Sequence, residues 1–224
     1  MLTVKYSKLE QARFLSHLDM QTILQRTIKR AGFMPIFTQG FNPRPIFKMS
    51  KPLPLGVASK CEYFSVDIPN ISKEAFIKDC AGQTPKGIEF LDVWVTERDP
   101  KVFNLGAVSE YEILLKNIKQ DKFSLVKKAI NEGFVVRKKQ KRQYIIQDVS
   151  NLIVDIGYVK NKMIVRLLST ESLNLRINDF LSGINTLLSA DLEISNVVKT
   201  NQYIGKEDIS IDTYLSKMEL NLKK

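Results

Sequence analysis

The stretch Leu2–Gly32, LTVKYSKLEQARFLSHLDMQTILQRTIKRAG, decides the fold of the first part of the chain. Its opening residues, Leu2–Tyr6, alternate between apolar and polar side chains, which predicts a strand. Ser16 is a favourable N-cap, and the apolar residues after it recur at helical spacing. Gly32 suits the end of a helix, and Pro35 prevents the helix from continuing. The stretch therefore predicts a strand, then a helix that begins after Ser16 and ends near Gly32.

Further strands and helices alternate along the rest of the chain. In the first half, the pattern predicts strands at 36–38, 62–68 and 88–96 and a helix at 73–80. In the second half, it predicts helices at 123–131 and 174–188 and strands at 111–115, 134–137, 144–147, 152–156, 163–168 and 192–198. This order predicts an α+β fold with two tandem ferredoxin-like (βαββαβ) units, the second with an extra strand.

The same pattern divides the chain into four parts. Residues 1–98 form the first ferredoxin-like unit, which includes a long proline-rich loop at 39–56. A linker at 99–108 begins with Asp99–Pro100, where proline restricts the residue before it. The second unit spans 109–205, and residues 206–224 are expected to form a C-terminal tail.

Composition and charge narrow the class of protein. Of 224 residues, 34 are Lys or Arg and 24 are Asp or Glu, a net charge of +10. This excess favours a polyanionic partner, which is RNA, DNA or an acidic protein. Hydrophobic residues make up 44% and charged residues 26%, which indicates a folded chain. No apolar run approaches the roughly 18 residues that span a bilayer, and the N-terminus lacks an apolar signal core, so neither a membrane segment nor export is expected.

Cysteine and histidine are too few for several kinds of chemistry. The two cysteines, Cys61 and Cys80, are not in a CxxC pair, so a zinc or iron–sulfur site held by this chain alone is not predicted. A single histidine, His17, excludes any mechanism that needs two imidazoles. The sequence also contains no Walker A loop, GxGxxG, GxSxG or HExxH motif, and its carboxylates form no spaced pair that would support a hydrolase.

The segment FLSHLD, residues 14–19, is the first candidate site. It brings His17 to a helix N-terminus, with Asp19 close by and Arg13 just upstream. A histidine there can act as a general acid or base in metal-independent RNA cleavage, or it can bind a phosphate through the helix start. The alternative is that His17 is a polar capping or surface residue, and for catalysis this alternative is favoured.

The proline-rich loop at 39–56 is the second candidate site. It contains four of the eight prolines and exceeds the length of about 12–15 residues beyond which loops are usually functional or disordered. Its aromatic and basic residues interleave, an arrangement that suits single-stranded nucleic acid. The alternative is a rigid crossover whose phenylalanines fill the core. The candidate binding residues are Gln39, Phe41, Asn42, Arg44, Lys48 and Lys51.

The run RKKQKR at 137–142, next to Tyr144, is the third candidate site. Five charges in six residues on a hairpin tip predict a contact with a polyanion. A solvated hairpin on a lysine-rich protein explains the run equally well. The candidate residues are Arg137, Lys138, Lys139, Lys141 and Arg142.

Two longer segments resemble a known family. FLSHLDMQTILQRTIKRAG and TQGFNPRPIFKMSKPLPLGVASKCEYFSVDI are similar to the radical-SAM-linked protein family, whose members occur beside, or fused behind, a radical S-adenosylmethionine (SAM) protein. The motifs SHLD, RAG, QGFNP and PLPLG follow one another at the family's spacing. The resemblance is close over Val4–Ile68 and weaker after Ser109, where RKKQKRQYIIQDVSNLIVDI resembles the family's second half. The family usually has a histidine where this chain has Arg44.

The resemblance implies a cytoplasmic bacterial protein that works with a radical SAM partner on RNA or a ribosomal substrate. It implies that the iron–sulfur cluster and S-adenosylmethionine belong to the partner, so no cofactor is expected in this chain. The tandem ferredoxin-like order also looks like the RAMP endoribonucleases that process CRISPR repeats, which is an analogy at the level of the fold.

Three hypotheses of function follow. The leading one is a non-catalytic module that grips RNA in a cleft between the two units and presents it to the radical SAM partner. Gln39–Arg44 and Lys51 would line that cleft, His17 and Arg13 would flank it, and 137–142 would attract the RNA. The second hypothesis is a metal-independent endoribonuclease that uses His17. The third is a protein–protein adaptor that binds no nucleic acid.

Overall fold

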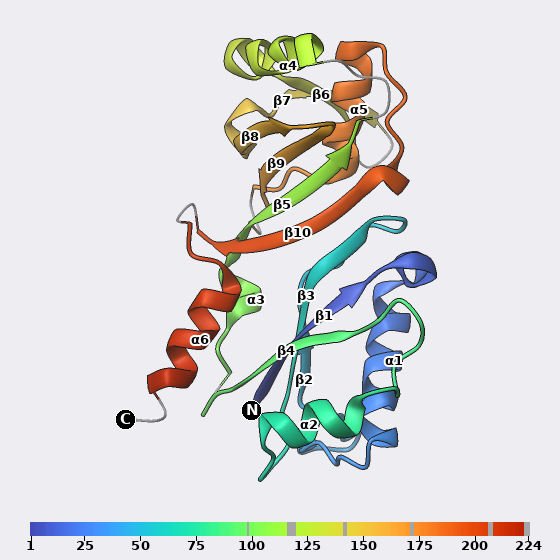
Figure 1. The fold of residues 1–224 in the computed structure, drawn as a ribbon, viewed down its shortest axis with the longest axis vertical. Helices are drawn as coiled ribbons and strands as arrows, with labels where there is room; N and C mark the ends of the chain where they lie inside the picture. The colour runs from blue at the N-terminus through green and yellow to red at the C-terminus, as the bar shows by residue number, and fades with distance from the viewer. Residues whose placement is uncertain (98, 116–119, 141–142, 171–172, 206–207, 222–224) are drawn as a thin grey trace. The chain divides into compact units, whose positions relative to one another are not determined.

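The structure is a computed structural model that describes residues 1–97, 99–115, 120–140, 143–170, 173–205 and 208–221. The chain divides into two compact units: Met1–Leu105 with Ile209–Lys224 form unit 1, and Gly106–Asp208 form unit 2. Each unit combines helices with antiparallel strands (Figure 1), so the predicted α+β class is confirmed. Among the described residues, no helix has both the length and the apolar character that a membrane crossing requires.

Unit 1 is built on an antiparallel sheet with the strand order β4-β1-β3-β2. The four strands are β1 (Leu2–Lys8), β2 (Phe47–Met49), β3 (Ala58–Val66) and β4 (Phe90–Val95). The 3-10 helix η1 (Glu10–Phe14) and helix α1 (His17–Arg30) connect β1 to the next part of the chain, and α2 (Lys73–Cys80) connects β3 to β4.

The core of unit 1 lies between one face of this sheet and helices α1 and α2. Alternate residues of β1 point to this face, and they pack with the apolar stripe of α1 and with Phe64 and Phe76. A stripe of this kind is what the helical spacing after Ser16 predicts. The core residues of β1 are Leu2, Val4 and Tyr6, and those of α1 are Met20, Leu24 and Ile28.

Helix α6 (Ile211–Asn221) belongs to unit 1 although it lies at the end of the chain. Asp212 accepts hydrogen bonds from Lys5 Nζ at 2.5 Å and from the Tyr63 hydroxyl at 2.8 Å. Trp94 Nε1 donates to the Ser216 hydroxyl at 3.1 Å. These partners alternate along the strands with the core residues, so α6 covers the opposite face of the sheet. The sequence predicts only a C-terminal tail at 206–224, whereas the structure has helix α6 over Ile211–Asn221. A local pattern does not reveal a helix that docks on strands distant in the sequence.

Unit 2 has an antiparallel sheet with the strand order β10-β5-β9-β8. Its strands are β5 (Gly106–Leu114), β8 (Ile153–Val159), β9 (Lys162–Leu168) and β10 (Val197–Ile204), and its helices are α4 (Gln120–Gly133) and α5 (Ile177–Leu188). Strands β6 (Val135–Gln140) and β7 (Gln143–Asp148) form a separate two-stranded sheet between α4 and β8. The short helices are α3 (Val102–Leu105) at the end of unit 1 and the 3-10 turns η2 (Ser150–Leu152) and η3 (Ile194–Asn196).

A polar network ties three strands of unit 2 together. Arg166 on β9 donates to Glu110 on β5 at 2.9 Å and to the Tyr203 hydroxyl on β10 at 3.0 Å. Thr200 and Tyr203 also donate to Glu110, at 2.9 and 3.0 Å. Burial raises the pKa of Glu110, but these hydrogen bonds outweigh burial and hold the pKa below its ordinary value.

Candidate nucleic-acid interface

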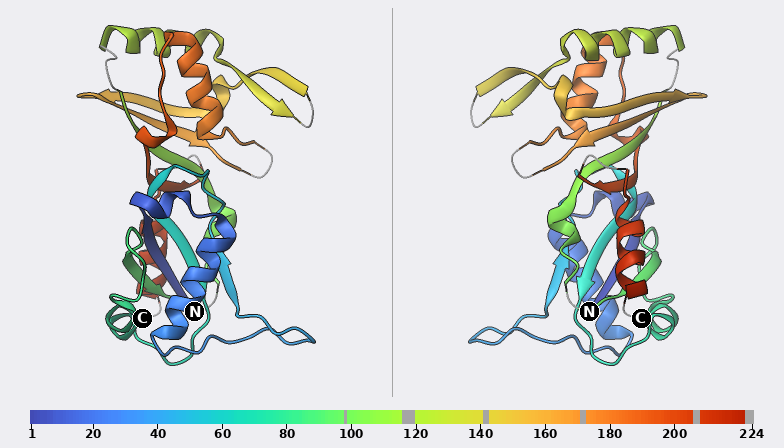
Figure 2. Two further views of the ribbon diagram at one scale, coloured as in Figure 1. Left: turned by 90° about the vertical axis from the view of Figure 1, so that its right-hand side faces the viewer. Right: turned by 90° about the vertical axis from the view of Figure 1, so that its left-hand side faces the viewer.

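A protruding loop in unit 1, residues 36–46, is named here the first hairpin. Its arms are joined by the amide of Thr38, which donates to the Arg44 carbonyl at 2.8 Å, and by the amide of Ile46, which donates to the Ile36 carbonyl at 2.8 Å. Only one β-bridge forms, between Phe37 and Pro45, because proline has no amide to extend the ladder. The strand expected at 36–38 is therefore reduced to this bridge, and the regular strand β2 follows inside the predicted loop. Figure 2 shows the hairpin extending away from the body of unit 1.

The predicted binding residues on the first hairpin face solvent. Gln39, Asn42 and Arg44 are exposed, and Phe41 is fully exposed, with a relative surface of 106%. Phe47 behaves differently, because its ring stacks on the core residue Phe64 with a centroid distance of 5.2 Å. The hairpin therefore combines an anchored base with a tip whose aromatic ring and cation are available to a ligand.

The stretch of sequence that contains the first hairpin carries charge of one sign, and the acidic residue next to it in space is Asp67, whose backbone bonds to Ile36 and Ile46 at the base of the hairpin. Between Asp19 and Glu62 the sequence contains no acidic residue. The same segment contains seven basic residues, which are Arg26, Lys29, Arg30, Arg44, Lys48, Lys51 and Lys60. One of these charges is paired locally, because Lys48 Nζ forms a salt bridge with Asp99. The remaining excess favours an anionic ligand at this part of unit 1.

His17 begins helix α1, and its neighbours Ser16 and Asp19 form a capping box. The Ser16 hydroxyl accepts a hydrogen bond from the Asp19 amide at 3.1 Å, and the Ser16 amide donates to the Asp19 carboxylate at 3.2 Å. Hydrogen bonds from Ser16 keep the pKa of Asp19 below its ordinary value. Ser16 is therefore the N-cap of α1, as the sequence predicts. The half-buried imidazole of His17 takes no part in the capping box.

Two buried charges near His17 are missing from the sequence-based candidates. Glu62 on β3 is 3% exposed and accepts hydrogen bonds from the hydroxyls of Ser59 at 2.8 Å and Ser50 at 3.1 Å. Lys8 on β1 is also 3% exposed and donates to the Leu15 carbonyl at 2.7 Å. The sequence gives no signal for the burial of Glu62, because its strand, ASKCEYFSV, also contains Lys60 and two serines.

Burial and nearby charge perturb the titration of this cluster. Burial lowers the pKa of Lys8, and the charge of Glu62 partly opposes that shift. Burial also lowers the pKa of His17, with Glu62 raising it and Lys8 lowering it further. The imidazole is therefore predominantly neutral at pH 7, and it is able to accept a proton.

The unit 1 candidates fall into two groups at opposite ends of α1. The carbonyl of Arg13 accepts a hydrogen bond from the Gly56 amide at 3.0 Å, so Arg13 and His17 lie where the proline-rich loop ends. Lys51 follows Ser50, whose hydroxyl binds Glu62, and so it belongs to this group. The first hairpin begins beyond the other end of the 14-residue helix, which spans about 21 Å. Helix α1 therefore separates His17 and Arg13 from Gln39–Arg44.

Strands β6 and β7 of unit 2 are named here the second hairpin. The Arg137 guanidinium lies over the Tyr144 ring, 4.2 Å from its centroid. Lys138 Nζ donates to the Asn174 carbonyl at 3.3 Å, and Lys139 lies on β6. The candidates Lys141 and Arg142 lie outside the described residues. Residues 137–139 of the basic run thus lie on β6, and two of their charges contact other groups of unit 2.

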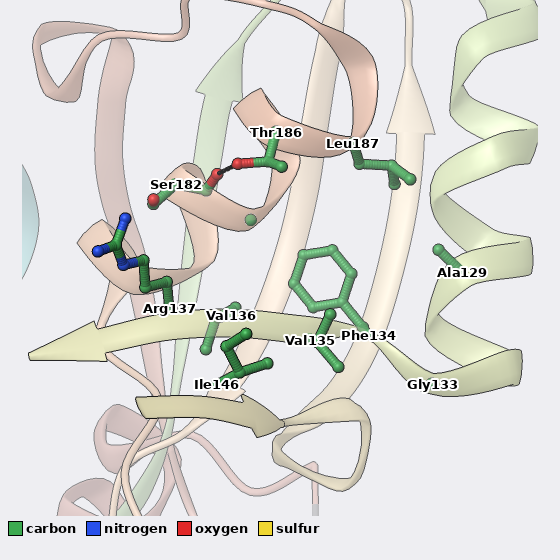
Figure 3. A pocket seen from close by; sticks show the side chains of 11 residues that line it. Ala129, Gly133, Phe134, Val135, Val136, Arg137, Ile146, Ser182, Thr186 and Leu187 are labelled. Atoms are coloured by element: carbon green, nitrogen blue, oxygen red, sulfur yellow. Dashed lines mark hydrogen bonds between the residues drawn. The ribbon is translucent and has the colours of Figure 1, made fainter. Parts of the chain in front are cut away.

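A pocket of about 410 Å³ lies against the base of the second hairpin. Figure 3 shows Phe134 and Val136 on its floor, with Arg137 at one end. A Cβ atom on Gly183 of helix α5 would be 2.7 Å from the Phe134 ring and 2.9 Å from Val136, so glycine permits the close approach of α5 to β6. Within the described part of the chain, no group of three or more histidine, cysteine, aspartate or glutamate side chains is placed to hold a metal ion.

These features define a basic α+β protein of two compact units, each of which presents an exposed hairpin with aromatic and cationic side chains. The chain belongs to the bacterial family described as "Uncharacterized protein conserved in bacteria (DUF2344)", whose model matches residues 1–177. A search of curated proteins found no match.

Among solved structures, the chain is similar to one chain of the crystal structure of a Cbf5–Nop10–Gar1 complex. The sequences are 11% identical, the TM-score is 0.45, and the similarity covers 90% of this chain and 48% of that chain. This protein therefore spans about half the length of the chain it matches. A similarity at this level is too low to carry an argument about fold or function.

Proposed function

We propose that this protein is an RNA-binding accessory module that presents single-stranded RNA, or a ribosome-related substrate, to a radical SAM partner enzyme. The observation that carries the proposal is the first hairpin, whose tip exposes Phe41 completely beside the exposed Arg44. An exposed phenylalanine is unfavourable in water and becomes useful when a base stacks on it. Arg44 adds a cation for phosphate, in a segment that contains no carboxylate from residue 20 to residue 61.

The geometry favours an unpaired strand over a duplex. A narrow hairpin tip with one aromatic ring offers a base an exposed π-face, which is accessible only when the base is unstacked. Gln39 and Asn42 flank Phe41 and provide amide donors and acceptors for the edge of such a base. The second hairpin contributes cations that attract the strand without a specific geometry.

The proposal includes a scaffold of two ferredoxin-like units. The shared connectivity supports it, because each unit runs strand, helix, two strands, helix, strand and has its last strand beside its first. Unit 2 differs by the insertion of the second hairpin between α4 and β8.

The partner in this proposal is a radical SAM protein in the bacterial cytoplasm. The ordered motifs SHLD, RAG, QGFNP and PLPLG support it through the family resemblance. The iron–sulfur cluster and S-adenosylmethionine would be bound by that partner. Co-expression with a radical SAM protein from the same bacterium, followed by nuclease treatment and purification, tests the pairing. Separate elution of the two proteins would contradict it.

RNA binding is tested by the salt dependence of affinity. A fluorescein-labelled, ten-nucleotide single-stranded RNA of mixed sequence is titrated with the full chain at several KCl concentrations. Because phosphate contacts release counterions, log Kd is expected to rise linearly with log [KCl], with a slope of about 0.7 per contact. The same strand annealed to its complement is expected to bind more weakly. Binding that does not respond to salt would argue against a phosphate interface, and binding to the nuclease-treated partner alone would favour a protein adaptor.

A second candidate function is a metal-independent endoribonuclease, which is favoured by the lowered pKa of His17 beside Glu62 and Lys8. Labelled RNA is incubated in EDTA with wild type and with His17→Ala. Cleavage by wild type that His17→Ala abolishes would establish this activity. Intact RNA in both reactions, with binding retained, supports the accessory module.

A further inference from the structure

A second feature of unit 1 adjoins the base of the first hairpin. A pocket of about 300 Å³ opens between α1 and the hairpin, which is near the lower limit for small-molecule sites. It is separate from the exposed tip at Phe41. Its lining residues come from α1, from residues 33–37 and from the second arm of the hairpin with the start of β2.

The two sides of this pocket differ in chemistry. The hairpin side is apolar and aromatic, with Phe33, Phe37 and Phe47. Phe47 is held by its stack on Phe64, and Phe33 by its stack on Phe76 at 5.4 Å, so these walls are anchored in the core. Because these phenylalanine side chains are already held in place, they lose little conformational entropy when a flat ligand stacks against them.

The helix side carries polar and cationic groups. Gln25 offers an amide that both donates and accepts, while Arg26 and Lys29 are exposed at the rim. The Thr22 hydroxyl donates to the Leu18 carbonyl at 3.0 Å, which leaves its lone pairs to accept. No carboxylate is among the residues that line the pocket. An aromatic wall, an amide and two cations together suit a flat ring that has polar groups at its edge and a negatively charged group on each side.

We infer that this pocket holds one unpaired nucleobase of a single-stranded RNA, while another base stacks on Phe41. The inference rests on the proposed function and extends it from a general surface to a defined base-binding site. The base would contact the aromatic wall, its edge would hydrogen-bond to Gln25, and Arg26 and Lys29 would meet the flanking phosphates. An apolar side chain of a partner protein would fit the wall but would leave both cations without a counterpart.

The first test uses the RNA itself. A set of ten-nucleotide RNAs carries one abasic nucleotide, moved through every position, and Kd is measured for each. We expect two positions at which the abasic substitution weakens binding about tenfold or more. The Phe41→Ala variant should lose the effect at one of them and keep it at the other. The position whose effect Phe41→Ala keeps is called the remaining position. The fluorescence of 2-aminopurine placed there should be quenched when the RNA binds.

The second test fills the pocket. Gln25→Trp should weaken binding of the intact RNA about tenfold but leave unchanged the affinity for the RNA that is abasic at the remaining position. Gln21→Trp is the matched control, because Gln21 lies one turn earlier on α1 and does not line the pocket. Thermal melting and circular dichroism establish that both variants are folded. If Gln25→Trp unfolds, Gln25→Ala with the same RNAs takes its place.

The outcomes separate this inference from the proposed function. Salt-dependent RNA binding with only one abasic-sensitive position, lost in Phe41→Ala, would overturn the pocket and leave RNA binding intact. No RNA binding by wild type would overturn both. RNA binding that Gln25→Trp leaves unchanged, together with loss of co-purification with the radical SAM protein, would assign the pocket to a protein side chain and overturn the inference.

Discussion

The two hairpins carry similar residues but use them differently. In the first hairpin, Phe41 is fully exposed and the arms are joined by a single bridge, because prolines interrupt the ladder. In the second, six residue pairs form a regular ladder, and Arg137 covers Tyr144. The ring of Phe41 in the first hairpin is thus uncovered, whereas the ring of Tyr144 in the second is covered by the guanidinium of Arg137.

This difference shows that a count of basic and aromatic residues does not identify a binding surface. The run at 137–142 is the densest cluster of basic residues among the three candidate sites, but Arg137 and Lys138 already have partners in unit 2. The first hairpin has fewer charges and a more accessible ring. We therefore expect the first hairpin to contribute most of the contact energy and the second mainly long-range attraction.

The largest expected effect comes from removing the exposed ring. Phe41→Ala should weaken binding of single-stranded RNA by about 1–3 kcal/mol, because a stacked base loses its platform. The matched change on the second hairpin, Tyr144→Ala, removes an exposed cation–π pair worth about 0.5–1 kcal/mol and should alter affinity less. Fluorescence anisotropy of both variants measures the difference. An equal loss in the two variants would contradict the contrast between the hairpins.

A smaller effect is expected from Gly183→Ala at the base of the second hairpin. The new methyl group would press on Phe134 and Val136, which are both buried, and overpacking costs about 1–3 kcal/mol. Alanine recovers roughly 0.5–1 kcal/mol of helix preference, so the net loss of stability is up to about 2.5 kcal/mol. Chemical denaturation measures the loss. Under conditions in which the variant is fully folded, its affinity for RNA should change little. Unaltered stability would mean that α5 and β6 can separate without cost.

Removing a cation from each hairpin should change the salt dependence of RNA affinity by different amounts. Arg44→Gln should lower the slope of log Kd against log [KCl] by about 0.7, the value for one lost contact to a single strand. Arg137→Gln should lower it by less, since Tyr144 already holds that guanidinium. Titrations at four or more KCl concentrations give both slopes. A larger change for Arg137→Gln would reverse the assignment.

The smallest effect concerns the pH dependence of unit 2, which carries the second hairpin. The folded-state pKa of Glu110 lies below its ordinary value of 4.5, so its contribution to stability is complete above that value and is lost as pH falls through the folded pKa. Glu110→Gln should therefore be less stable than wild type at pH 7, by about 1 kcal/mol or less. The gap should close on acidification. Denaturation curves at pH 7 and pH 3 measure it, and a gap that grows at pH 3 would exclude this role.

Much of the local structure was predictable because it depends on near neighbours. Ser16 caps α1 as its sequence position predicts, and the helix ends just before Gly32. The strands expected at 134–137 and 144–147 are β6 and β7. The burial of Lys8 and Glu62 was not predictable, since a single charge in a short strand gives no information about what covers it. The separation of His17 from Gln39–Arg44 likewise depends on the length and direction of α1.

The sequence by itself determined the alternation of strands and helices, the excess of positive charge and the proline-punctuated loop. These properties follow from periodicity, charge and backbone restriction within a few residues. Only the tertiary structure decided that α6 returns to unit 1, where Asp212 meets Lys5 across 207 positions of sequence. It alone also decided that Phe41 is exposed while Phe47 joins the core. Exposure depends on which distant elements pack against a side chain, and no local pattern encodes that packing.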